Sequence, residues 1–187
     1  MKASIIAVVN PEPHSGKTTV VEVLARDLAE AGHKVLAIDA DPKATLTDNL
    51  ERLIIEGSLA DVLGSTIPIT EVIHATPYPF ELVPSFSDLG DWVDDISINQ
   101  FKRALAPALD RYDYILIDAP SAINALALSI INCADALLAP VHHRIRRPTP
   151  IDRHHVAFIP KKINKRLNDL YDFVNDDLFF LPSSLLW

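Results

Sequence analysis

Short apolar runs alternate with segments of helical periodicity along most of the chain. The runs fit strands buried on both faces, and apolar residues recurring every three or four positions fit helices packed on a sheet. The expected strands are residues 3–9, 35–38, 80–83, 114–117, 136–141 and 156–159. The expected helices are residues 18–31, 98–109, 122–132 and 163–174, with short helices in 44–75 that begin at Ser58 and Thr70. This order predicts an α/β fold, a parallel β-sheet flanked by helices on both faces.

The first of these helices has the clearest pattern. Val21, Leu24 and Leu28 recur at helical spacing, and Gly32 follows at the position expected for a C-cap. The helix directly follows the first predicted strand, so the two form the opening of a βαβ unit.

Length and composition fit a globular domain. The chain has 187 residues, of which 49% are hydrophobic and 22% charged, so neither a disordered chain nor a disulfide scaffold is expected. The single cysteine, Cys133, lies in an apolar stretch and is expected in the core. No apolar run reaches the ~18 residues of a membrane span, and the first residues do not fit a secretory signal. We therefore expect one cytoplasmic domain over residues 1–187.

The net charge of −8 is unevenly distributed. Residues 1–140 hold 9 Lys/Arg and 20 Asp/Glu, whereas residues 141–166 hold 8 Lys/Arg and 1 Asp/Glu. The basic window supports two interpretations, a surface that binds DNA nonspecifically or a solvated loop and helix face. The candidate DNA-binding residues are Arg144, Arg146, Arg147 and Arg153.

A candidate phosphate-binding loop lies between the first strand and the first helix. Its residues are Ser15, Gly16, Lys17, Thr18 and Thr19. The lysine suits the β- and γ-phosphates of a nucleotide and the following hydroxyl suits Mg²⁺. Pro11 stands where the full pattern has its first glycine, and a plain helix N-cap is the alternative.

Three carboxylates follow two of the later strands. Asp39 and Asp41 end the second strand, and Asp118 ends the strand at 114–117. Open α/β sheets bind ligands beyond the carboxyl ends of their strands, where an Asp at a strand end can hold Mg²⁺. The phosphate-binding loop, the stretch with Asp39 and Asp41, and the strand ending at Asp118 together predict a nucleotide site with Mg²⁺.

With these motifs the chain resembles the ParA/Soj branch of the ParA–MinD family of deviant Walker A P-loop NTPases. The resemblance covers about three quarters of the chain, is strongest within residues 1–141, and is carried by the stretches SGKTTV, VLAIDADPKATL, ELVPSFSDL and YDYILIDAPSAINALALSIINCADALLAPV. It implies a slow partition ATPase that dimerises on ATP, binds DNA nonspecifically in that state and responds to a ParB-like adaptor. Such a protein would be nucleoid-associated and would position plasmids, chromosomes or other cargo.

The resemblance also implies a role for each site residue. Lys17 would contact the β- and γ-phosphates, while Thr18 would ligate Mg²⁺ and Asp118 would hold the metal through water. Asp41 would orient the attacking water, and Asp39 would assist near the metal. The cofactors implied are ATP and Mg²⁺.

The chain departs from the family in its loop. Glu12 stands where the family has an additional lysine, with Pro13 and His14 in place of glycines. A carboxylate there reverses the sign of an interaction with phosphate, so dimer-dependent hydrolysis is expected to be weakened or to use another cation. The candidate cations are Lys43, Lys161 and Lys162.

The C-terminal part differs as well. Residues 142–187 are divergent and shortened, and the 14 residues before the strand at 156–159 barely suffice for a crossover helix. Two alternatives therefore remain beside a ParA-like ATPase. One is a degenerate, non-hydrolysing nucleotide-dependent binding module, and the other, disfavoured by the Asp-Ala-Asp-Pro stretch, is a dethiobiotin-synthetase-like ligase.

Overall fold

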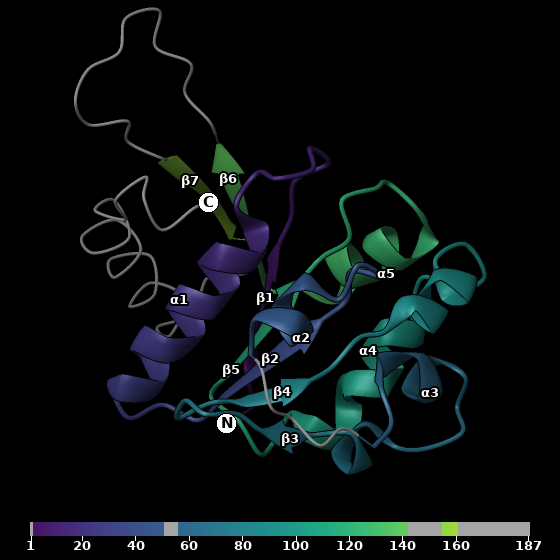
Figure 1. Ribbon diagram of the computed structural model, residues 1–187, viewed down its shortest axis with the longest axis horizontal. Coiled ribbons are helices and arrows are strands. Elements are labelled where there is room, and N and C mark those ends of the chain that lie inside the picture. The colour runs from purple at the N-terminus through teal and green to yellow at the C-terminus, as the bar shows by residue number, and fades with distance from the viewer. Residues whose placement is uncertain (1, 51–55, 142–154, 161–187) are drawn as a thin grey trace, which may run out of the picture.

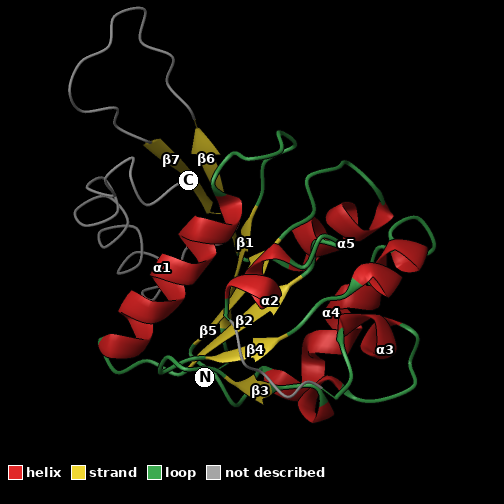
Figure 2. Ribbon diagram, viewed as in Figure 1, coloured by secondary structure: helices red, strands yellow, loops and turns green. Residues whose placement is uncertain are grey.

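In a computed structural model, the chain folds into a sheet with helices packed on both faces (Figures 1 and 2). The structure describes residues 2–50, 56–141 and 155–160. The strands are β1 (Ser4–Val8), β2 (Val35–Asp39), β3 (His74–Ala75), β4 (Glu81–Val83), β5 (Tyr114–Asp118), β6 (Ala136–Val141) and β7 (His155–Pro160). The α-helices are α1 (Lys17–Glu30), α2 (Thr45–Asn49), α3 (Leu59–Leu63), α4 (Gln100–Leu105) and α5 (Ala125–Cys133). Short 3₁₀ helices are η1 (Ile69–Glu71), η2 (Ser87–Trp92) and η3 (Ala106–Ala108).

The described strands lie in the order β3-β4-β2-β5-β1-β6-β7. The central five strands are parallel, as expected. In this register Ile115 of β5 lies between Ile5 of β1 on one side and Leu36 of β2 on the other. The two edge strands are antiparallel to their neighbours. The sequence leaves only 14 residues before the last strand, close to the minimum for a crossover helix. In the structure β7 runs antiparallel to β6, and antiparallel neighbours need no crossover helix.

The sequence prediction and the observed elements differ mainly in short segments. Ser58 caps α3 through a capping box with Asp61, as expected of a helix start. Thr70 does not begin a helix, because it lies inside η1, whose N-cap is Pro68. The helix expected at 98–109 breaks into α4 and η3 near Pro107, which lacks the N–H needed to continue an α-helix. The helix expected at 163–174 lies outside the described residues.

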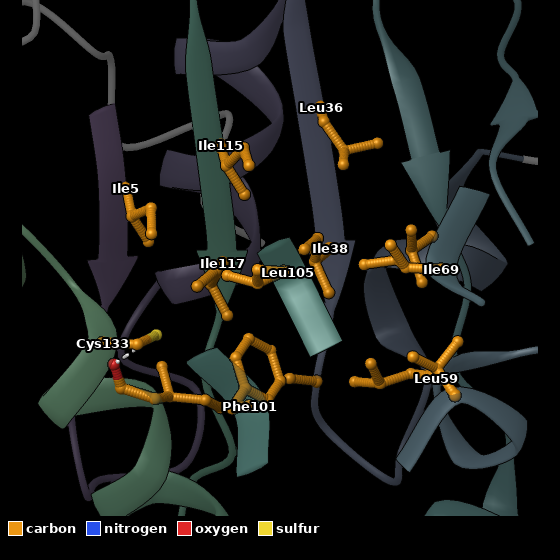
Figure 3. Packing of buried hydrophobic residues seen from close by; sticks show 14 of the residues in the cluster. Ile5, Leu36, Ile38, Leu59, Ile69, Phe101, Leu105, Ile115, Ile117 and Cys133 are labelled. Carbon is orange, nitrogen blue, oxygen red and sulfur yellow. Dashed lines mark hydrogen bonds between the residues drawn. The ribbon is translucent and has the colours of Figure 1, made fainter. Parts of the chain in front are cut away.

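Alternate residues of the central strands build two apolar layers. Ile5, Ile115 and Ile117 face α3, α4 and α5, whereas Ile6, Tyr114 and Leu116 face α1 and α2. Figure 3 shows the first layer, in which Cys133 is buried and its thiol donates to the Ile130 carbonyl at 3.1 Å. Since both faces are covered, the strand positions are fixed, and with them the loops at the strand ends. No helix in the described ranges is long and apolar enough to cross a membrane.

Candidate functional site

Three loops meet at the carboxyl edge of the sheet. They follow the neighbouring strands β1, β5 and β2. Lys17 begins the helix after the first loop, and Asp118 and Asp39 are the last residues of β5 and β2. Asp39 and Asp118 are register partners on adjacent strands, so their backbones lie side by side. The structure thus brings the three sequence motifs to one place, at the position where open α/β sheets bind ligands.

The loop between β1 and α1 contains two backbone positions in the left-handed region. Gly16 has φ +85° and is the N-cap of α1, a conformation that glycine adopts without strain. His14 has φ +58°, which costs a residue with a Cβ on the order of 1 kcal/mol. Behind them Ser15 is buried, and its Oγ has no hydrogen-bond partner.

Lys17 points its ammonium group into the site. It is only 5% exposed, and its Nζ donates to Ser121 Oγ at 2.8 Å. Burial lowers the pKa of Lys17, and the nearby charges of Asp118 and Asp41 oppose that effect. A buried ammonium beside a helix N-terminus is suited to hold an anion.

Thr18 and Asp118 form the second part of the site. Thr18 Oγ1 donates to Asp118 Oδ2 at 2.6 Å, and the other carboxylate oxygen, Oδ1, is buried without a partner. Burial, followed by the charge of Asp39, raises the pKa of Asp118 to about 7. An orphaned carboxylate oxygen next to a hydroxyl suits a hard cation such as Mg²⁺, which takes oxygen ligands.

Asp39 is fully buried and holds the loop that follows β2. Its Oδ2 accepts from the Thr47 backbone N at 2.9 Å and from Thr47 Oγ1 at 2.8 Å, and its Oδ1 accepts from the Asp41 N at 3.2 Å. Burial raises the pKa of Asp39 to about 6, although the hydrogen bonds from Thr47 oppose the rise. Both oxygens are therefore engaged in positioning the loop.

Asp41 lies further out, between two loops. Its Oδ1 accepts from the Lys43 N at 3.0 Å, and its Oδ2 accepts from both the N and the Oγ of Ser121 at 3.3 Å. Ser85 Oγ donates to the Asp41 carbonyl at 2.9 Å. The carboxylate is therefore oriented by its own loop and by Ser121, while Ser85 holds the Asp41 backbone.

Ser121 and Thr47 are the contacts that sequence reasoning missed. The only sequence signal for Ser121 is a hydroxyl three residues after the strand-terminal Asp118. Thr47 carries no signal, because its role depends on α2 folding back onto Asp39.

Glu12 lies on the outer side of the phosphate loop and is exposed. Its backbone N donates to Asn10 Oδ1 at 2.8 Å, and Asn10 Nδ2 donates to the Pro140 carbonyl at 2.6 Å, so this turn is tied to β6. Glu12 lines a mostly apolar cavity of about 480 Å³ together with Pro120 and Ile123. Among the described residues, no ion pair joins the Glu12 carboxylate to Lys17.

Of the remaining candidate cations, Lys43 lies within the described residues. Lys43 is exposed, and its charge slightly lowers the pKa of Lys17, which places it near the site. Lys161 and Lys162 lie outside the described residues. So do the four candidate DNA-binding residues, Arg144, Arg146, Arg147 and Arg153.

The residues present fit a nucleotide phosphate and Mg²⁺. Ser15 Oγ and Asp118 Oδ1 are buried polar atoms without partners, which is costly unless a ligand satisfies them. In the described ranges no group of three or more His, Cys, Asp or Glu side chains could hold a metal ion. One hydroxyl and one carboxylate match Mg²⁺, which is commonly held by few protein groups together with phosphates.

The parallel sheet and the strand–loop–helix that carries Lys17 define the class of P-loop NTPases. A family model described as "AAA domain" matches residues 3–174, and the chain belongs to this family. Within it the chain is ParA-like: Soj, the sporulation initiation inhibitor protein of Bacillus subtilis, is 32% identical over 145 residues, or 73% of this chain and 57% of Soj. The chromosome partitioning protein ParA of Myxococcus xanthus is 33% identical over 146 residues, covering 73% of this chain and 51% of that protein.

A solved structure shares the fold as well. A plasmid partition protein from Borrelia burgdorferi is 25% identical and superposes with a TM-score of 0.72, covering 97% of this chain and 77% of that one. The chain spans about half the length of the curated relatives that it matches, 57% of Soj and 51% of the Myxococcus xanthus ParA.

Proposed function

We propose that the chain is a ParA-like ATPase that binds ATP with Mg²⁺, hydrolyses it slowly and positions DNA or another cargo. The convergence of Lys17, the Thr18–Asp118 pair and Asp41 on one edge of the sheet carries this proposal. The similarity to the ParA of Myxococcus xanthus and to a plasmid partition protein supports the partition role.

Each residue has a task in this proposal. Lys17 neutralises the β- and γ-phosphates, and Thr18 with Asp118 holds Mg²⁺, the Asp118 carboxylate acting through water. When bound, the metal supplies positive charge to the phosphates. Asp41 orients the attacking water, while Asp39 fixes the Asp41 loop near the metal through its bond to the Asp41 N. Ser15, Gly16 and Thr19 complete the phosphate loop.

ATP turnover with and without DNA tests the enzyme proposal. In the Lys17→Ala and Asp41→Ala variants turnover is expected to fall to background, because each removes a charge in contact with the reacting groups. Lys102→Ala serves as the control, since Lys102 is an exposed lysine on α4. Turnover that is absent from the parent chain, while ATP still binds, would favour a non-hydrolysing binding module in which Glu12 has replaced the catalytic cation.

The proposal extends to partners and location. A ParA-like protein would form an ATP-dependent homodimer, answer to a ParB-like adaptor, and act in the cytoplasm on the nucleoid, as one domain over residues 1–187. The basic residues Arg144, Arg146, Arg147 and Arg153 would supply the nonspecific DNA surface. Retention on DNA is then expected to fall steeply with salt and to weaken when Arg144, Arg146 and Arg147 are neutralised. Salt-independent retention would refute this surface.

A further inference from the structure

The Ser121 side chain hydrogen-bonds to both Lys17 and Asp41. It lies three residues beyond Asp118, in the loop between β5 and α5, and is half-buried. Its Oγ accepts from Lys17 Nζ at 2.8 Å and donates to Asp41 Oδ2 at 3.3 Å. Its backbone N donates to the same Oδ2 at 3.3 Å.

These contacts fix the direction of the Ser121 hydroxyl. An ammonium group has no lone pair, so Lys17 can only donate, and the Ser121 oxygen must accept. The hydroxyl hydrogen is then left for Asp41. The hydroxyl therefore lies between a cation and an anion. Its bond to Lys17 is short at 2.8 Å, and its bond to Asp41 is longer at 3.3 Å.

The hydroxyl also separates two groups that attract each other strongly. No ion pair joins Lys17 to Asp41 within the residues that the structure describes, although burial lowers the pKa of Lys17 and the charge of Asp41 partly opposes that effect. In a buried site of low dielectric, a direct pair between them would be much stronger than in water. Such a pair would turn the Asp41 carboxylate away from the attacking water, while Lys17 would keep its place at the start of α1.

Asp41 is held on its other side as well. The Lys43 N donates to Asp41 Oδ1 at 3.0 Å, so the two carboxylate oxygens have different partners, and the plane of the group is set. Removal of the Ser121 hydroxyl leaves the backbone N as the sole described donor to Oδ2. The carboxylate would then be free to turn toward Lys17.

We propose that the side chain of Ser121 is a positioning residue that keeps Lys17 and Asp41 apart and correctly oriented for hydrolysis of the bound nucleotide. The proposal rests on the proposed ATPase function. It predicts a loss in the rate of turnover rather than in the binding of nucleotide, since Lys17 retains its charge and its place on α1.

The test compares three variants with the parent chain. Ser121→Ala removes the hydroxyl, Ser121→Thr retains it, and Ser87→Ala changes an exposed serine of η2 as a matched control. The measurements are kcat and KM for ATP, the dissociation constant of a non-hydrolysable ATP analogue, and the melting temperature. A hydrogen bond to a charged group corresponds to roughly a tenfold change or more in rate.

Ser121→Ala is expected to lower kcat at least about tenfold. Its affinity for the analogue is expected to stay within about threefold of the parent, because no phosphate ligand is removed. Ser121→Thr and Ser87→Ala are expected to keep kcat within about threefold of the parent.

Three outcomes would overturn the proposal: Ser121→Ala turning over ATP like the parent, Ser121→Thr being as slow as Ser121→Ala, or a loss confined to analogue affinity. A parent chain whose turnover does not exceed that of Lys17→Ala would instead refute the ATPase function itself, and the role of Ser121 with it. The parent's own activity therefore separates the two failures.

Discussion

Asp118→Asn is expected to stabilise the protein in the absence of nucleotide. Asp118 is 1% exposed, and burial raises its pKa from 3.8 to about 7, so its ionisation in the folded state costs about 4 kcal/mol relative to the unfolded chain. Asparagine removes the charge and keeps an oxygen that can accept from Thr18 Oγ1. The amide nitrogen of the asparagine would take the place of Oδ1, which has no hydrogen-bond partner. A buried N–H donor left without an acceptor costs about 1–3 kcal/mol. The net gain at pH 8 is about 1–3 kcal/mol.

The same shift fixes the sign of the pH dependence. A carboxyl whose pKa is raised by folding favours the folded state at low pH, and this advantage is lost as pH rises from about 4 through about 7. Asp118 should therefore lower the free energy of unfolding by about 3 kcal/mol between pH 5 and pH 8. Asp39, with its pKa raised to about 6, adds a smaller slope of the same sign that the variant retains.

Urea titrations at pH 5 and pH 8 measure these quantities. Asp88→Asn is the matched control, because Asp88 is exposed on η2 and its replacement should leave both values unchanged. Stabilisation by Mg²⁺ with an ATP analogue is expected for the parent and lost in Asp118→Asn. A variant that is less stable than the parent at pH 8, or that keeps the full pH slope, would refute the burial argument.

Three further changes have separable effects. Tyr112→Phe removes the 2.6 Å hydrogen bond from the Tyr112 hydroxyl to Glu81 at the amino ends of the strands. Urea titration should show a loss of about 2 kcal/mol in the free energy of unfolding. ATP turnover should be unchanged, and altered turnover would contradict this. Ser58→Ala removes the N-cap of α3 and should cost about 1 kcal/mol by the same titration, whereas a neutral change would mean that the cap contributes nothing. Glu12→Lys places a cation in the phosphate loop and should raise ATP-dependent dimerisation, measured by light scattering, and ATP turnover, measured by phosphate release. The activity of Glu12→Gln should lie between those of the parent and Glu12→Lys. Equal activity of all three proteins would rule out the charge effect.

The central sheet was predictable because its strands are buried on both faces. Such strands appear as continuous apolar runs, and the strand at 136–141 was predicted with the bounds that β6 has. The edges were not predictable in the same way. β3 has only two residues, His74 and Ala75, and the direction of β7 depends on pairing with β6 rather than on any local pattern.

The candidate site was predictable as a set of motifs, since each lies at the end of a strand. Its hydrogen-bond network was not. Lys17 and Ser121 are 104 positions apart, and Ser85 reaches the Asp41 loop across 44 positions. Contacts of this kind are set by the order of strands in the sheet and by how the loops fold back, neither of which periodicity encodes.

The burial of charge at this edge of the sheet links stability to function. Asp39 and Asp118 are buried side by side, and the buried Lys17, which is 5% exposed, is a cation close to Asp118. Carboxylates so placed destabilise the nucleotide-free protein, and the close-packed layers on both faces of the sheet offset that cost. A bound cation would remove part of this cost, because its positive charge would offset the charge of the buried carboxylates. A variant that becomes more stable on losing Asp118 and at the same time loses its response to Mg²⁺ would therefore identify the same side chain as the source of both properties.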